Sequence, residues 1–192
     1  MDFWATSLDG WLGALIGAVA AVAIAVWVLR RTLAHERRLF LEQLEAEREL
    51  GLEQRRLEAF GQVAAWTRRL VPTPVDRERM LVVQVGLVGA VQAWRTYLPS
   101  SDDPIGDEVE ALSFSWLNRA WRCQREQARR NATLPPEMTK GMVVDEDMGQ
   151  QVIGVMREVR RWHQGDVVRE SLVAALRAEL AVSREAYKLL PE

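Results

Sequence analysis

Three side chains of this 192-residue sequence are of the types that most often act as nucleophiles or proton carriers: His35, Cys123 and His163. His35 stands in a His-Glu-Arg-Arg-Leu segment, which lacks the second histidine of a zinc-protease helix. His163 falls at a predicted helix end, where a cation stabilises the helix dipole. Cys123 lies on the apolar stripe of a predicted helix, which indicates a small buried hydrophobe rather than a nucleophile.

Sequence motifs of catalysis are missing as well. There is no phosphate-binding glycine loop, no nucleophile elbow and no paired metal-ligand spacing. We therefore predict no catalytic residue, no cofactor and no enzymatic activity. The one route to an enzyme left open is a set of dispersed carboxylates, which no pattern in a single sequence reveals.

Three consecutive acidic residues, Asp145, Glu146 and Asp147, form the one cluster that resembles a metal site. An EF-hand loop counted from Asp145 would need glycine at its sixth position and glutamate at its twelfth, but Gln150 and Met156 stand there. Acidic residues at a helix start complement the helix dipole. The cluster therefore predicts a helix cap and no metal.

Four arginines share a broad face of a helix predicted from about Asp107 to Arg130: Arg119, Arg122, Arg125 and Arg129. Such a face could bind anionic lipid headgroups, an acidic partner or nucleic acid, and a plain solvated face is the alternative. No Phe or Tyr interleaves these arginines, so the stacking platform of a single-strand binder is missing. Nucleic acid is therefore the least favoured of these partners.

An uninterrupted apolar run, WLGALIGAVAAVAIAVWVL, occupies residues 11–29. A helix of this length rises about 28 Å, close to the hydrocarbon thickness of a bilayer. A cleavable signal peptide is the alternative, but signal peptides have a basic leader and a shorter apolar core, whereas this leader carries Asp2 and Asp9. The run therefore predicts a retained transmembrane helix, with membrane lipid as a partner.

Charge around the apolar run predicts its orientation. Basic residues follow the run and none precedes it, which places the N-terminus outside and the remainder in the cytoplasm; these residues are Arg30, Arg31, Arg37 and Arg38. The single Cys123 suits a reducing compartment. Arginine outnumbers lysine by 23 to 2, as in GC-rich genomes, which points to a bacterial inner (plasma) membrane.

Residue types inside the run predict further contacts. Trp11 and Trp27 lie near its two ends and, with Arg30 and Arg31, mark the membrane interfaces. A stripe of small residues at every fourth position favours close approach of a second helix, and it consists of Gly13, Gly17, Ala21 and Ala25. We expect a homo-oligomer, although small residues also simply fill lipid-facing helices.

Strong helix formers dominate residues 30–56, which predict a helical stalk. A near-heptad seam makes a coiled coil plausible, but Gln43 and Glu53 interrupt it; the seam consists of Leu39, Ala46, Leu50, Leu57, Phe60 and Ala64. From residue 57 the apolar face widens, as where a stalk enters a packed domain. The predicted organisation is an outer N-terminus (1–10), a transmembrane helix (11–29), a stalk (30–56) and a helical domain (57–192).

The domain of residues 57–192 reads as a bundle of about four or five helices, in an all-α chain. Prolines at 72 and 74 end the first helix, and Asp76 caps the second. Residues 80–94 are almost wholly apolar, which predicts a core helix, with a membrane-embedded hairpin or a strand as alternatives. Beyond residue 29 there are 25 basic and 25 acidic residues, since two of the 27 acidic ones precede it.

These features favour a single-pass adaptor that presents a helical bundle to an unidentified protein partner at the membrane. The alternative is a membrane-active effector or signal transducer, in which the stalk or the 80–94 segment moves relative to the bilayer.

Overall fold

Five α-helices make up most of the chain in this computed structural model, which describes the backbone of residues 3–189 and the side chains of residues 17–189. The helices are α1 (Phe3–Leu70), α2 (Arg77–Arg95), α3 (Asp103–Asn131), α4 (Glu146–His163) and α5 (Arg169–Leu189). Short 3-10 turns occupy Ser100–Asp102 and Pro136–Met138. The chain divides into two compact units, residues 1–51 and 52–192. The predicted mostly helical fold is confirmed.

The first unit is the N-terminal part of α1, where alanine, valine and leucine favour an uninterrupted helix. From Gly17 to Leu70, α1 is the one described helix long and apolar enough to cross a membrane, with a mean hydropathy of 1.6 over its best window. None of that window is buried, and Ile24, for example, is 63% exposed. A signal sequence near an N-terminus meets the same criterion.

Local capping chemistry sets the starts of α2 and α4. The Asp76 side chain accepts a hydrogen bond from the Glu78 amide (3.0 Å), and Asp145 accepts one from the Met148 amide (3.0 Å). Both predicted caps are therefore confirmed. The last helix begins at Arg169.

A two-stranded antiparallel ribbon was not expected from the sequence. Strand β1 (Pro72–Pro74) pairs with β2 (Met142–Val144), with Thr73 opposite Val143, and the Val75 amide donates to the Gly141 carbonyl (3.1 Å). The prolines hold β1 extended and supply no amide donors. Each strand has three residues, which is too short for an alternating pattern that could be recognised in the sequence.

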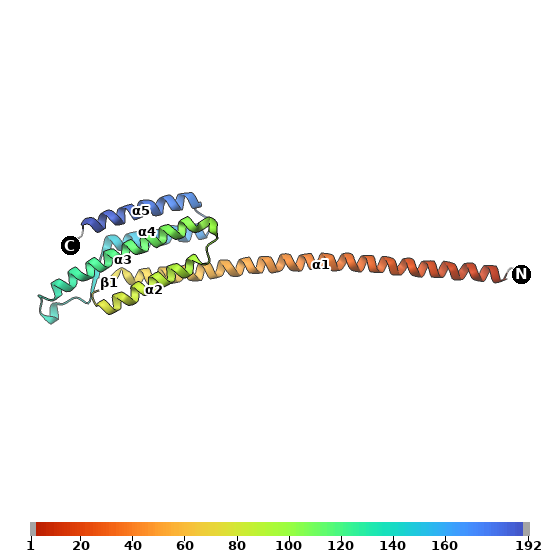
Figure 1. Cartoon of the computed structure of the whole chain (residues 1–192), viewed down its shortest axis with the longest axis horizontal. Helices are drawn as coiled ribbons and strands as arrows, with labels where there is room; N and C mark the ends of the chain where they lie inside the picture. The colour runs from red at the N-terminus through yellow and green to blue at the C-terminus, as the bar shows by residue number, and fades with distance from the viewer. Residues whose placement is uncertain (1–2, 190–192) are drawn as a thin grey trace. The chain divides into compact units, whose positions relative to one another are not determined.

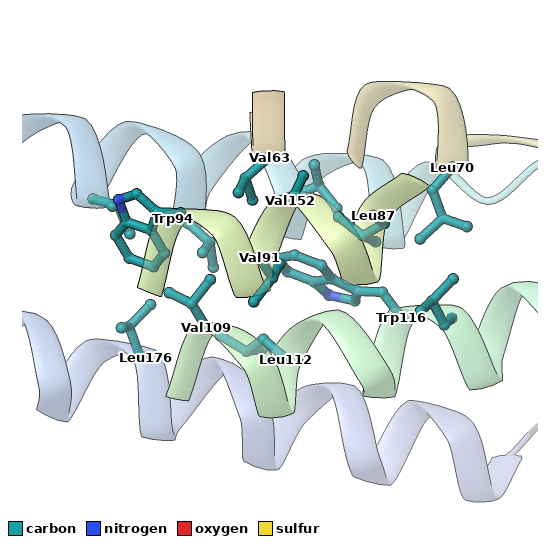
Figure 2. Packing of buried hydrophobic residues seen from close by; sticks show 14 of the residues in the cluster. Val63, Leu70, Leu87, Val91, Trp94, Val109, Leu112, Trp116, Val152 and Leu176 are labelled. Atoms are coloured by element: carbon teal, nitrogen blue, oxygen red, sulfur yellow. The ribbon is translucent and has the colours of Figure 1, made fainter. Parts of the chain in front are cut away.

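The second unit closes around one hydrophobic core. Figure 1 shows α2, α3, α4 and α5 running alongside one another, and side chains from these four helices and from the end of α1 meet between them (Figure 2). The largest fully buried side chains are Trp94, Trp116, Leu70, Met80, Leu87 and Ile105. The expected bundle therefore has a continuous core.

The apolar segment 80–94 forms most of α2, so the strand alternative is wrong. Its buried face carries Met80, Val83, Leu87, Val91 and Trp94, in helical spacing. Its outer face remains apolar and exposed, through Leu81, Val82 and Val85. The segment is thus a core helix with a second, uncovered apolar face.

Gly86 marks the closest approach between α2 and the end of α1. A Cβ atom at this position would overlap the indole ring of Trp66, whereas a Cβ at Gly89 would meet nothing within 4 Å. We expect Gly86→Ala to lower the free energy of unfolding by about 1–3 kcal/mol through overpacking. Gly89→Ala should raise it by roughly 0.5–1 kcal/mol, because alanine favours the helix. Urea denaturation of both variants measures these changes. Equal changes in the free energy of unfolding would show that the Trp66 ring moves aside at no cost.

Candidate functional site

His163 lies in an aromatic cluster at the end of α4. Its ring centroid is 5.3 Å from that of Phe60, 6.1 Å from that of Trp94 and 4.5 Å from that of Trp162. Burial, with a smaller contribution from the Arg56 guanidinium, lowers the pKa of His163 to about 4. Nε2 is buried and has no hydrogen-bond partner among the described residues. The ring is therefore neutral at pH 7 and packs as an aromatic side chain.

Cys123 is half-buried on α3, with Sγ 4.0 Å from Oδ2 of Asp145. Burial, followed by the negative charge of Asp145, raises the pKa of this thiol above its usual value. The reactive thiolate is therefore scarce at neutral pH. The other candidate, His35, is an exposed residue of α1.

The acidic cluster at residues 145–147 divides between two environments. Asp145 caps α4 and turns inward, whereas Glu146 and Asp147 are exposed. Within residues 17–189, no three His, Cys, Asp or Glu side chains are grouped so that they could hold a metal ion. The cap interpretation is confirmed for Asp145.

Arg119 does not lie on a solvated arginine face with the other three arginines. It is 5% exposed, and its Nε and Nη2 donate to Oδ2 and Oδ1 of Asp145, each at 2.6 Å. This two-point geometry neutralises both charges inside the second unit. Helical spacing alone did not reveal it, because the partner is 26 residues further along the chain.

The other three arginines lie nearer the surface. Arg122 donates from Nη1 to the Tyr187 carbonyl (2.9 Å), and its guanidinium lies 4.1 Å from the centre of the Tyr187 ring. Arg125 and Arg129 are exposed and line a hollow of the bundle.

This hollow is a basic groove of about 860 Å³ between α2, α3 and α5. Arg77 and Leu81 of α2, Trp121, Arg125 and Arg129 of α3, and Tyr187 of α5 contribute its charged and apolar lining. None of the described residues that line it is acidic. The sequence analysis missed Arg77 because only folding brings α2 beside α3. It also found no aromatic partner for the arginines, and the groove supplies Trp121 and Tyr187.

Arginines beside aromatic and aliphatic side chains can bind an anion that has an apolar part. Volumes of about 300–1,000 Å³ are typical of ligand sites. The lining holds no histidine, cysteine or carboxylate that could transfer a proton. The groove is thus chemically suited to recognition.

The membrane-facing candidates lie on α1. Gly17, Ala21 and Ala25 share a helix face that is exposed in the single chain, and a Cβ at Gly17 would meet nothing within 4 Å. The Arg31 guanidinium lies 5.4 Å from the centre of the Trp27 ring, and Arg30 is exposed beside it. The side chains of Gly13 and Trp11 lie outside the described residues. Comparison with protein-family models, curated proteins and solved structures finds no match to this chain.

Proposed function

We propose that the chain is a single-pass membrane adaptor: an N-terminal anchor helix, a helical stalk and a cytoplasmic helical bundle that binds partners. The observation that carries the proposal is the wholly uncovered apolar window at the start of α1. Burying apolar surface contributes about 25 cal/mol per Å², so a row of exposed Val, Ile and Leu side chains needs a cover. A bilayer provides one of matching thickness, because about 19 helical residues span its hydrocarbon region.

Orientation with the N-terminus outside follows from the arginines beyond the window, since basic residues are retained on the cytoplasmic side. The contact between Trp27 and Arg31 fits this end of the helix, where an indole and a guanidinium both favour the headgroup layer. The bundle would then lie in the cytoplasm, where a free thiol such as Cys123 remains reduced.

Self-association is the second part of the proposal. The small-residue stripe of Gly13, Gly17, Ala21 and Ala25 would allow two anchors to pack closely. Three leucines of the candidate coiled-coil seam, Leu39, Leu50 and Leu57, are exposed in the single chain, as expected of a surface that a second copy covers. Paired anchors would hold two bundles together and raise their effective concentration for a partner.

Recognition rather than catalysis is proposed for the bundle because the basic groove offers arginines and aromatic rings. A membrane-active effector is the second candidate, and the exposed outer face of α2 favours it: Leu81, Val82 and Val85 could enter a bilayer. Complete insertion of α2 would, however, also remove Met80, Leu87 and Trp94 from the core, which opposes it.

Topology separates the two candidates. We expect a cytoplasm-active fluorescent reporter fused after Pro74, Pro99 or Glu192 to be active at all three positions, and a periplasm-active phosphatase to be inactive at all three. Phosphatase activity beginning only after Pro99 would make α2 a membrane crossing and favour the effector. An N-terminus that begins beyond residue 20 in the purified protein would show that the apolar window is a cleaved signal.

Anchoring also predicts the effect of charge in the helix. Two arginines at its centre, in Ala21→Arg with Ile24→Arg, each cost about 2.5–3.5 kcal/mol of insertion free energy. We expect this double variant to leave the carbonate-resistant membrane fraction. The matched control, Ala21→Leu with Ile24→Leu, should remain there, and equal retention of both variants would contradict the anchor.

A further inference from the structure

The basic groove has a fixed floor and a charged rim. The Trp121 Nε1 group donates to Oε1 of Gln84 on α2 (2.8 Å), which holds the indole in place. The Nε2 group of Gln124, another lining residue, donates to the Val75 carbonyl (2.7 Å). Arg122 contacts Tyr187 twice, through the hydrogen bond to its carbonyl and through the guanidinium beside its ring. The floor is therefore formed before any ligand arrives, which lowers the entropic cost of binding.

The rim carries positive charge from two different helices. Arg77 begins α2 and Arg125 belongs to α3, and both side chains are exposed. The Nε group of Arg125 donates a long hydrogen bond to the Trp121 carbonyl (3.4 Å), and no acidic residue lines the groove among those that the structure describes. An acidic ligand would therefore supply the charge that the lining lacks.

Groove length helps to identify the ligand. Its α3 wall runs from Asn118 to Arg129, a rise of roughly 16 Å along the helix. A single phosphate would be bound most tightly by donors converging on one point, whereas these arginines stand apart on an open rim. A bilayer surface is flat and cannot follow a hollow. An extended chain with several carboxylates fits both the length and the spacing of charge.

The geometry points to a docking site for an acidic segment of a partner protein, with carboxylates at Arg77 and Arg125 and an apolar side chain against Leu81 and Trp121. This assignment rests on the proposed interaction function and names its partner chemistry. Leu81 is exposed, so covering it adds a hydrophobic contribution to the ion pairs. Because exposed charges carry much of the attraction, binding weakens as salt increases.

The test is selection of binding peptides by the full chain, held in nanodiscs of zwitterionic phosphatidylcholine. A random peptide library of about ten residues spans the groove with room at both ends. We expect enrichment of sequences that contain several Asp or Glu residues and at least one Leu, Phe, Trp or Tyr. Failure to enrich any sequence, or enrichment without acidic residues, would overturn the assignment.

Matched variants locate the binding site. Arg77→Glu and Arg125→Glu should each weaken binding of the best selected peptide by about tenfold or more. Arg79→Glu is the control, since Arg79 lies in the same first turn of α2 but outside the groove. Its effect should be under about threefold, while circular dichroism confirms that all three variants fold. If Arg77→Glu and Arg79→Glu weaken peptide binding equally, the effect comes from the overall charge of the chain, and the groove is not the binding site.

Three further probes address other anions: inorganic phosphate, phosphatidylglycerol vesicles and a single-stranded oligothymidine. If one of these probes displaces the bound peptide at a concentration lower than that of the peptide, and Arg125→Glu abolishes this competition, that anion would replace the acidic peptide as the assigned ligand. Peptide selection does not depend on the orientation of the helix, because both faces of a nanodisc are open to the peptides, and the reporter fusions test the orientation separately. If no peptide is selected while the reporter fusions still place the bundle in the cytoplasm, the acidic-peptide site is refuted and the membrane-adaptor proposal is not.

Discussion

Replacing Arg119 with alanine is expected to lower the free energy of unfolding by about 3–5 kcal/mol. Arg119 and Asp145 form a buried ion pair with two hydrogen bonds, and their side chains are 6% and 12% exposed. Removing the arginine leaves an Asp145 carboxylate that water reaches poorly and that no longer has its cation. The same carboxylate also caps α4, so its displacement would disturb the start of that helix.

Two further variants separate charge from capping and from exposure. Asp145→Asn keeps a side chain that can cap α4 but removes the negative charge, so a loss similar to that of Arg119→Ala would identify the ion pair as the cause. Arg177 pairs with Glu108 at 2.7 Å but is 66% exposed. Arg177→Ala should therefore cost less than about 1 kcal/mol. Denaturant unfolding followed by tryptophan fluorescence measures all three, and a small effect of Arg119→Ala would show that water enters the pair.

The features of this fold that were predictable are those encoded within a few residues. The cap at Asp76, the cap at Asp145 and the helix end before Pro72 each depend on a side chain acting on the adjacent backbone. The apolar segment of α2 was also readable as a core helix, although valine alone allowed a strand. For the two caps and the helix end, the physical cause lies inside a stretch shorter than two helical turns, and for α2 it is one local pattern repeated along the helix.

The features that were not predictable depend on contacts between distant residues. Arg119 and Arg125 were assigned to one broad helix face, yet Arg119 pairs with Asp145 in the interior while Arg125 stays at the surface. The basic groove needs Arg77, Trp121 and Tyr187 from three different helices. The β1 and β2 strands are each too short to produce a pattern and exist only as a pair. These features depend on which residues meet after folding, and a single sequence does not show which residues those are.

A comparable limit applies to the small-residue stripe at the N-terminus. Gly17, Ala21 and Ala25 share an exposed helix face that no other described part of the chain covers. Exposure in one chain supports both the anchor and the self-association proposals, so they need separate measurements. Crosslinking of a Gly17→Ile variant would address association while membrane retention addresses anchoring.

Acidification is expected to destabilise the bundle between about pH 6.5 and pH 4 through His163. The pKa of His163 is lowered to about 4 in the folded chain, below the ordinary value of 6.5. Between these two pH values, His163 therefore binds a proton in the unfolded chain but not in the folded chain. Stability from the neutral ring is complete above pH 6.5 and is lost progressively as the pH falls toward 4. The slope is at most about 1.4 kcal/mol per pH unit, and less because the half-buried ring is partly screened by solvent.

His163→Phe provides the matched variant, because phenylalanine keeps an aromatic ring against Phe60, Trp94 and Trp162 but cannot titrate. The difference in unfolding free energy between the two proteins should be constant above pH 6.5 and should shift in favour of the variant below it. Arg56→Met should reduce the slope of the native chain, since loss of this nearby cation lets the folded pKa of His163 rise toward its ordinary value. Arg56 also donates from Nε to the Tyr97 carbonyl (3.2 Å). Loss of this hydrogen bond lowers the unfolding free energy of Arg56→Met equally at all pH values. A change in the pH dependence of the unfolding free energy is therefore due to His163. Parallel profiles for the native chain and His163→Phe between pH 6.5 and 4 would assign the acid sensitivity to carboxylates instead.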